Sequence, residues 1–330
     1  PGLSVRPVAL LDQPPAQHQW LVQDLWSHQA VGVIGGPPKS CKTWLGLDLA
    51  LSVASATPCL GSFEVDHSGP VLVYLAEDSL PMVRLRIEAI CRHRGLSLDA
   101  LNLYVVDAPS LRLDLAEDRR RLQTTLESFR PALLLLDPLV RLHQLDENNS
   151  GDISRLLGYL RNLQRRFHLA IALTHHMGKR NHGRLGQALR GSSDIHAWSD
   201  SSAYLQRKSD HLVLTVEHRS ASPREPVPLK LVTNNDQLGA HLEVFDEPQP
   251  DENDPHALAF DVQRLLTNSP HPLTRTELRS RLRVNNKRLG DTLLALEQQN
   301  LVVRTSAGWT PGAPAAVSTP DHDPRQLKFA

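Results

Sequence analysis

The chain has few cysteines, no long apolar run and no net charge, and each absence excludes a class of protein. Its 330 residues include three cysteines, Cys41, Cys59 and Cys91. An odd number of cysteines without a CxxC spacing argues against a disulfide framework and against a zinc ribbon. No apolar run approaches the roughly eighteen residues of a membrane span, and no signal peptide is recognisable. We therefore expect a cytoplasmic protein without a membrane partner.

Lys and Arg number 36 and are balanced by 36 Asp and Glu, so no global field points to a nucleic-acid partner. The charge is unevenly spread, however. Residues 241–254 hold six acids, two prolines and no Lys or Arg, which is typical of a linker. The length suits one large α/β domain and one small domain. We expect an N-terminal extension over 1–19, a large domain over 20–240, a linker over 241–254, a small domain over 255–310 and a disordered tail over 311–330.

Apolar runs alternate with amphipathic segments through the first half of the chain. The apolar runs lie at 31–35, 71–75, 103–106, 132–136 and 169–174, and the amphipathic segments lie at 43–56, 82–94, 114–129 and 152–167. Continuous apolar strands joined by helices predict an α/β fold with a mostly parallel sheet covered by helices on both faces. Runs at 203–207 and 211–216 predict an antiparallel hairpin that extends this sheet.

The segment 31–43 carries the most informative motif. A short apolar strand runs into a Gly- and Pro-rich loop, and a helix begins at Lys42 and Thr43. The P-loop pattern is Gly, four residues, then Gly-Lys-Ser/Thr. Such a loop aims backbone N–H groups at a polyphosphate in front of a helix N-terminus. The predicted nucleotide-binding residues are Gly36, Pro37, Pro38, Lys39, Ser40, Cys41, Lys42 and Thr43. The structural alternative is a glycine-rich turn between strand and helix.

Cys41 occupies the place of the second P-loop glycine. If the backbone there needs a positive φ, a residue other than glycine costs roughly 1 kcal/mol or more. In an electropositive loop we also expect the pKa of this thiol to fall and its reactivity to rise. Redox control is one interpretation, and a tolerated substitution is the one we favour.

Lys42 is expected to reach the β- and γ-phosphates of ATP, and the Thr43 hydroxyl to hold Mg²⁺. Asp137 ends the apolar run 132–136, where a carboxylate beside the P-loop strand suits Mg²⁺ coordination. Its alternative role is to cap the loop that follows. Glu77 follows the run 71–75 and is predicted to orient or deprotonate the attacking water. Asp78 competes with it for this role.

Two histidines, His175 and His176, end the run 169–174, where a polar side chain can touch the γ-phosphate. A zinc site made of these two and His182 is disfavoured, because no Cys or carboxylate lies at a metal-like spacing.

Residues 255–310 form a second patterned region. Helices are expected at 257–267, from 274 to about 282, where Thr274 and Glu277 have capping-box spacing, and at 285–299, followed by a hairpin at 301–309. This is the order of a winged helix-turn-helix. The region carries eight Lys and Arg against four acids, a net charge of +4. Its third helix opens with Asn285, Asn286, Lys287 and Arg288, and Arg304 lies on the expected wing, an arrangement that suits duplex DNA. Winged helices also dock proteins, and that alternative stays open.

Four segments, 36–43, 74–80, 133–142 and 172–179, together resemble the core of the RecA-like ATPases. Within that group they are most similar to the RepA-type hexameric plasmid helicases and related AAA-family ATPases, which share their core with the DnaB helicases. The resemblance extends over about residues 20–231. It implies Lys42 and Thr43 as Walker A, Glu77 as catalytic base, Asp137 as Walker B and His176 as sensor, with ATP and Mg²⁺ as cofactors.

The resemblance implies two further roles. The segment 177–191 resembles the DNA-facing loop of that fold, with Lys179, Arg180 and Arg184 available for the phosphates of single-stranded DNA; a solvated loop is the alternative. Arg219 lies where relatives place an arginine finger that completes the neighbouring subunit's site, which implies a homo-oligomer such as a hexameric ring. Arg190 competes for this role.

Two functions follow from these patterns. The first is a RepA-like replication helicase or DNA motor, favoured by the basic loop. The second is an ATP-switched DNA-binding regulator that does not unwind DNA. Glu217, which stands where DnaB-like helicases tend to carry Lys, favours the second.

Overall fold

The computed structural model describes residues 3, 5–11, 17–145, 150–176, 193–208, 211–222, 224–233, 239–245, 255–282 and 284–312. The chain divides into two compact units, Pro1–Phe245 and Asp246–Ala330. None of the described helices is both long and apolar enough to cross a membrane.

Nine strands of the first unit form one mixed sheet in the order β11-β10-β9-β8-β3-β7-β6-β4-β5. Its strands are β3 (Val31–Gly36), β4 (Val71–Leu75), β5 (Leu103–Val105), β6 (Leu133–Asp137), β7 (Ala170–His176), β8 (Ser201–Lys208), β9 (His211–His218), β10 (Val227–Thr233) and β11 (Ala240–Val244). The strands from β8 to β5 run parallel to one another. β9, β10 and β11 continue the sheet in antiparallel fashion. The predicted α/β class and the predicted β8–β9 hairpin are confirmed.

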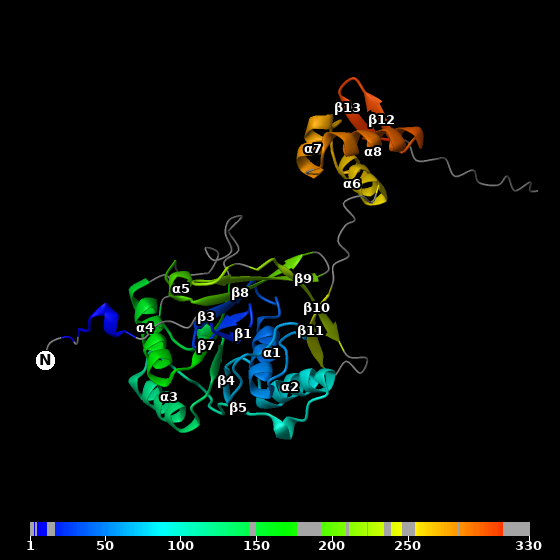
Figure 1. Ribbon diagram of the computed structural model, residues 1–330. Coiled ribbons are helices and arrows are strands. Elements are labelled where there is room, and N and C mark those ends of the chain that lie inside the picture. Colours follow the sequence, from blue (N-terminus) through cyan, green and yellow to red (C-terminus); the bar gives the residue numbers. More distant parts are fainter. Residues whose placement is uncertain are drawn as a thin grey trace, which may run out of the picture. The chain divides into compact units, whose positions relative to one another are not determined.

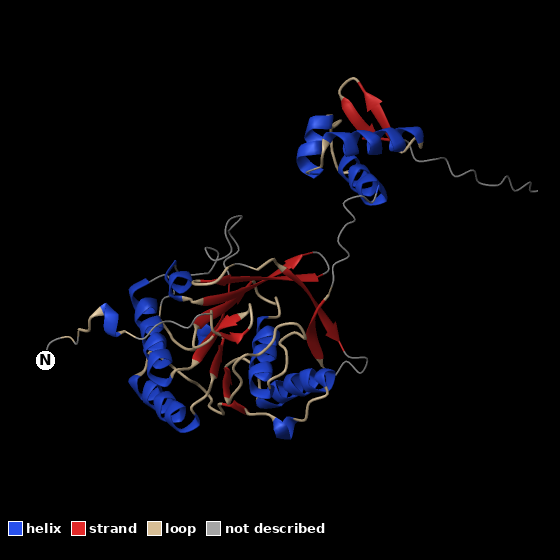
Figure 2. Ribbon diagram, in the orientation of Figure 1, coloured by secondary structure: helices blue, strands red, loops and turns tan. Residues whose placement is uncertain are grey.

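Helices cover both faces of this sheet (Figures 1 and 2). The helices α1 (Lys42–Ser55) and α2 (Leu80–Arg94) contribute to one hydrophobic cluster. The helices α3 (Ala116–Phe129), α4 (Ser150–Phe167) and α5 (Ser193–Trp198) contribute to the other. Alternate residues of the central strands enter opposite clusters because side chains alternate along a strand, which is why these strands are continuously apolar.

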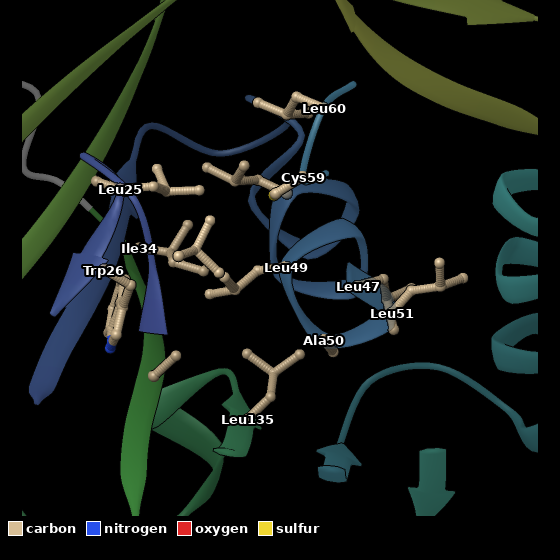
Figure 3. Packing of buried hydrophobic residues seen from close by; sticks show 14 of the residues in the cluster. Leu25, Trp26, Ile34, Leu47, Leu49, Ala50, Leu51, Cys59, Leu60 and Leu135 are labelled. Atoms are coloured by element: carbon tan, nitrogen blue, oxygen red, sulfur yellow. The ribbon is translucent and has the colours of Figure 1, made fainter. Parts of the chain in front are cut away.

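The first cluster fixes α1 directly behind the strands that carry the predicted site. Figure 3 shows Ile34 of β3, Leu49 of α1 and Leu135 of β6 within this cluster, and all three are at most 1% exposed. A Cβ on Gly46 of α1 would lie 3.1 Å from Leu135 Cδ1, so the helix lies very close to the sheet. Burial of each such Leu or Ile side chain contributes about 1.5–3 kcal/mol. The N-terminus of α1 is thereby held at one end of β3.

Several elements of the first unit were not predicted. They are β1 (Trp20–Val22), β2 (Trp26–Ser27), β10, β11 and α5. β11 overlaps the segment 241–254, which composition alone predicts to be linker, and the compact unit extends to Phe245. The sequence pattern did not predict this strand, because it lies in an acidic segment and only Ala240, His241 and Leu242 are buried in it. Strand β11 is stabilised by pairing with β10 rather than by its own composition.

The second unit contains helices α6 (Pro255–Thr267), α7 (Arg275–Leu282) and α8 (Asn286–Gln298), and a hairpin of β12 (Val302–Thr305) and β13 (Gly308–Pro311). The capping box is present, since Thr274 N donates to Glu277 Oε2 at 2.8 Å and Glu277 N donates to Thr274 Oγ1 at 3.3 Å. Asn285 caps α8 by accepting a bond from Arg288 N at 2.8 Å. These helices and the hairpin enclose a core of their own.

Candidate active site

The polar residues predicted for catalysis lie at one edge of the sheet. β3, β7, β6 and β4 are neighbours and parallel, so their carboxyl ends meet there. In register, Gly36 pairs with His176 and Leu75 pairs with Asp137. The carboxyl edge of a parallel sheet is where open α/β folds bind ligands. The fold therefore brings the P-loop, Glu77, Asp137 and His176 to a common edge.

The P-loop lies between the end of β3 and the start of α1. A Cβ on Gly36 would lie 2.5 Å from Ser40 Oγ and 2.7 Å from Leu205 O, so only glycine fits there. Lys39 and Cys41 have φ values of 63° and 66°, in the left-handed region. The loop thus has the tight turn that a phosphate cradle needs, although neither left-handed residue is a glycine.

Lys42, the first residue of α1, is 6% exposed. Its Nζ donates to Gly36 O at 3.1 Å and to Pro37 O at 2.9 Å, so the ammonium lies across its own loop. Burial lowers the pKa of Lys42, and the nearby Asp137 carboxylate opposes this shift. The ammonium is therefore positioned where a bound polyphosphate would replace the loop carbonyls as its partner.

Asp137 and Thr43 form a set of oxygen donors beside Lys42. Asp137 is 7% exposed and accepts hydrogen bonds from the hydroxyls of Thr174 and Thr43. Burial raises the pKa of this carboxyl, and the two hydroxyls oppose the shift. A carboxylate and a hydroxyl are hard ligands of the kind Mg²⁺ takes. A nearby dication would stabilise the charged form of the buried Asp137 carboxylate. Asp137 and Thr43 therefore fit Mg²⁺.

The two candidate bases have different partners. Glu77 is 47% exposed, and its Oε1 accepts a bond from Arg141 Nε at 2.8 Å. Asp78 Oδ1 accepts a bond from Arg86 Nη2 of α2 at 2.9 Å. Glu77 lines the cavity described below, whereas Asp78 is engaged by α2. The geometry favours Glu77 over Asp78 as the group that can meet a water molecule.

His176 completes the set at the end of β7. Its Nδ1 is buried and has no hydrogen-bond partner among the described residues. Burial, with Lys42 and His175 nearby, lowers the pKa of His176. The ring is thus neutral near pH 7 and retains an unused nitrogen beside the P-loop. His182, the third member of the disfavoured zinc set, lies outside the described residues.

A cavity of about 380 Å³ connects these groups. It is lined by Lys39, Ser40, Cys41, Lys42, Thr43, Trp44, Glu77, Arg86, Asp137, Pro138 and His176. Trp44 and Arg86 were missed by the sequence analysis, and the Arg86 guanidinium lies 5.3 Å from the centre of the Trp44 ring. Helical periodicity alone gives no signal for them, because α2 meets the P-loop only in the folded chain.

The expectation for Cys41 is wrong in one respect. Burial raises the pKa of its thiol, and the nearby Arg207, Lys42 and Arg86 only partly oppose that shift. We expected the electropositive loop to lower the pKa, but removal of the thiolate from water has the larger effect. At neutral pH, a smaller fraction of Cys41 is therefore ionised to the thiolate than in a free cysteine.

Arg219 is not part of this constellation. It follows β9, beside the paired residues Ser201 and His218. This is the end of the sheet where β3 and β8 begin, whereas the P-loop lies at the other end of β3. Its Nε lies 3.4 Å from Asp200 Oδ1, and its Nη2 donates to Ser199 O at 3.3 Å. Arg219 therefore does not reach the nucleotide site of its own chain. Arg190 and the segment 177–191, including Lys179, Arg180 and Arg184, lie outside the described residues.

Asp137 ends β6, which is separated from the P-loop strand β3 by β7, so it does not lie on the neighbouring strand as we expected. A P-loop with a buried lysine, this carboxylate and the parallel strands of the central sheet define a P-loop ATPase with a RecA-like core. A family model described as AAA domain matches residues 3–182, more than half of the chain. The chain belongs to this AAA domain family, whose members are ATP-binding P-loop ATPases. The match begins before Trp20, so part of the predicted N-terminal extension is included in the family domain.

Proposed function

We propose that this ATPase couples Mg²⁺-dependent ATP hydrolysis to DNA as a homo-oligomeric ring, in the manner of a RepA-like helicase or DNA motor. The observation that supports the catalytic part is the shared cavity at the carboxyl edge, where Lys42, Asp137, Glu77 and His176 meet. The DNA part rests on the basic second unit and on the basic loop 177–191.

In the proposed reaction, Lys42 exchanges the carbonyls of Gly36 and Pro37 for the β- and γ-phosphates and stabilises the charge that develops there. Thr43 and Asp137 would hold Mg²⁺, which supplies further charge neutralisation when bound. Glu77 orients the attacking water and takes its proton once Arg141 has released the carboxylate. The neutral ring of His176 uses its unpaired Nδ1 to detect the γ-phosphate.

Arg219 is proposed to act in the neighbouring subunit. Its guanidinium is half exposed, and it lines a cavity of about 450 Å³ at the edge opposite the P-loop. A residue at that edge can only complete a site that belongs to another copy. The proposal therefore requires an oligomer in which the edge bearing Arg219 meets the P-loop edge of the next chain.

Duplex DNA is the proposed partner of the second unit, which we interpret as a winged helix. Lys287 near the N-terminus of α8 and Arg304 of the hairpin are exposed, and so are Arg275 and Arg279 of α7. A cluster of cations near a helix N-terminus matches the way a recognition helix meets the phosphates and base edges of a major groove.

A second candidate function is an ATP-switched DNA-binding regulator without unwinding activity. Glu217 favours it, because this carboxylate pairs with His196 at 3.0 Å at the place where the helicases tend to carry a lysine. An acidic residue beside the arginine finger is less suited to a ring motor.

The decisive experiment is ATP hydrolysis by the full chain with and without single-stranded DNA, with Lys42→Ala as the blank. Strong stimulation by single strands, lost in Lys42→Ala, supports the motor. Hydrolysis that ignores single strands, together with ATP-dependent binding of duplex DNA, supports the regulator. If the chain binds neither single-stranded nor duplex DNA, both the motor and the regulator are refuted, and protein docking is the remaining role for the second unit.

A further inference from the structure

A cluster of potential metal ligands lies away from the nucleotide site, between α2 and β11. His93 near the C-terminal end of α2 meets His241 and Glu243 of β11, and one ligand atom from each lies within 4.8 Å of the others. His241 and Glu243 are two residues apart on a strand, which places both side chains on the same face of the sheet. The cluster thus joins a helix and the last strand of the sheet.

We propose that His93, His241 and Glu243 form a binding site for a divalent transition-metal ion of the Zn²⁺ class, which would clamp α2 to β11.

The distances suit such an ion. Glu243 Oε1 lies 2.7 Å from His241 Nε2 and 3.8 Å from His93 Nδ1. Tetrahedral Zn²⁺, with bonds of about 2.0–2.2 Å, holds its ligand atoms roughly 3.3 Å apart. The required movements are therefore about an ångström. Two imidazoles and a carboxylate also leave a fourth position open for water, and this ligand set suits Zn²⁺ better than Mg²⁺ or Ca²⁺.

The surroundings also favour a cation. The His241 side chain is 5% exposed, so its ring is already held out of water beside the Glu243 carboxylate. Glu243 contributes a carboxylate, so the cluster offers one negative charge to a dication.

One rearrangement is required. The rings of His93 and His241 are stacked, with centroids 3.7 Å apart and planes 16° apart, so their nitrogens do not yet converge on one point. His241 is buried in the strand, but His93 and Glu243 are 39% and 40% exposed. Rotation of these two exposed side chains would bring the ligand atoms around one ion.

The test uses the full chain, stripped of metal with a chelator and free of nucleotide, because ATP itself binds metal. Zn²⁺ is titrated by calorimetry, and Co²⁺ by visible absorption, which reports tetrahedral coordination. His93→Gln removes one ligand from an exposed position. His168→Gln is the matched control, since His168 is an exposed histidine outside the cluster.

We expect one Zn²⁺ per chain with a Kd below about 1 µM. At a Zn²⁺ concentration about a hundred times the Kd, the Tm should rise by roughly 5 °C. In His93→Gln the Kd should be at least about tenfold higher. His168→Gln should match the unaltered protein. Zn²⁺ binding that is only millimolar overturns the proposal. Binding that is equal in both variants also overturns it, because the ion is then held by other histidines.

Discussion

The left-handed backbone at Cys41 leads to a prediction about the P-loop. Cys41 has φ 66° and ψ 25°, a conformation in which a Cβ approaches the following carbonyl oxygen. Cys41→Gly removes that Cβ from a loop whose conformation is otherwise determined by Gly36 and α1. Since a residue other than glycine costs roughly 1 kcal/mol in this region, we expect Cys41→Gly to stabilise the fold by about that amount. In a unit of this size that corresponds to a rise in Tm of about 2–4 °C.

The assay is thermal unfolding without nucleotide, by calorimetry or circular dichroism. Cys41→Ala is the matched control, because it removes the thiol but keeps the Cβ and its left-handed cost. We expect Cys41→Gly to melt above both the unaltered chain and Cys41→Ala, which should differ little from each other. An equal Tm for all three proteins would refute the reasoning, since the loop then does not impose the left-handed conformation.

Three further predictions concern other parts of the first unit. Asp48→Ala removes the buried partner of Arg94 and should lower the free energy of unfolding in urea by about 3–5 kcal/mol, because an unpaired buried charge remains; an effect below 1 kcal/mol would contradict this. Arg141→Ala frees the Glu77 carboxylate and should raise basal ATP hydrolysis severalfold with little change in Tm, since this pair is exposed; an unchanged or lower rate would show that Arg141 does not restrain the base. Burial lowers the pKa of His218 below 6.5, so the unfolded chain binds more protons than the folded chain as the pH falls below that value. Stability should therefore decrease below pH 6.5, and His218→Gln should flatten the decrease in urea titrations at several pH values; an identical profile would exclude His218.

The central part of the fold was predictable because its signals are local. Four of the five apolar runs form strands that are buried on both faces, and only the edge strand β5 is partly exposed, so the runs stand out in the sequence. The strands β3 to β7 lie within one or two residues of the predicted ranges. The capping box at Thr274 also needs only four consecutive residues, and the structure shows it. Strands β10 and β11 were missed because each is buried only in part and depends on its neighbours for hydrogen bonds.

The same distinction holds for the candidate site. The P-loop is contiguous in sequence, and strand ends could be inferred from the apolar runs, so Lys42, Asp137, Glu77 and His176 were named before the structure placed them at one edge. Trp44 and Arg86 line the cavity only because α2 packs against α1 in the folded chain.

Local sequence patterns are enough to identify the P-loop, the acidic and polar residues that follow the strands, and the basic second unit. The neighbours of each of these groups depend on how the chain folds. The ion pair of Glu77 with Arg141, the raised pKa of the Cys41 thiol and the position of Arg219 at the far edge all depend on residues distant in sequence. Charge and burial act through space, and the order of residues does not reveal which distant groups will become neighbours.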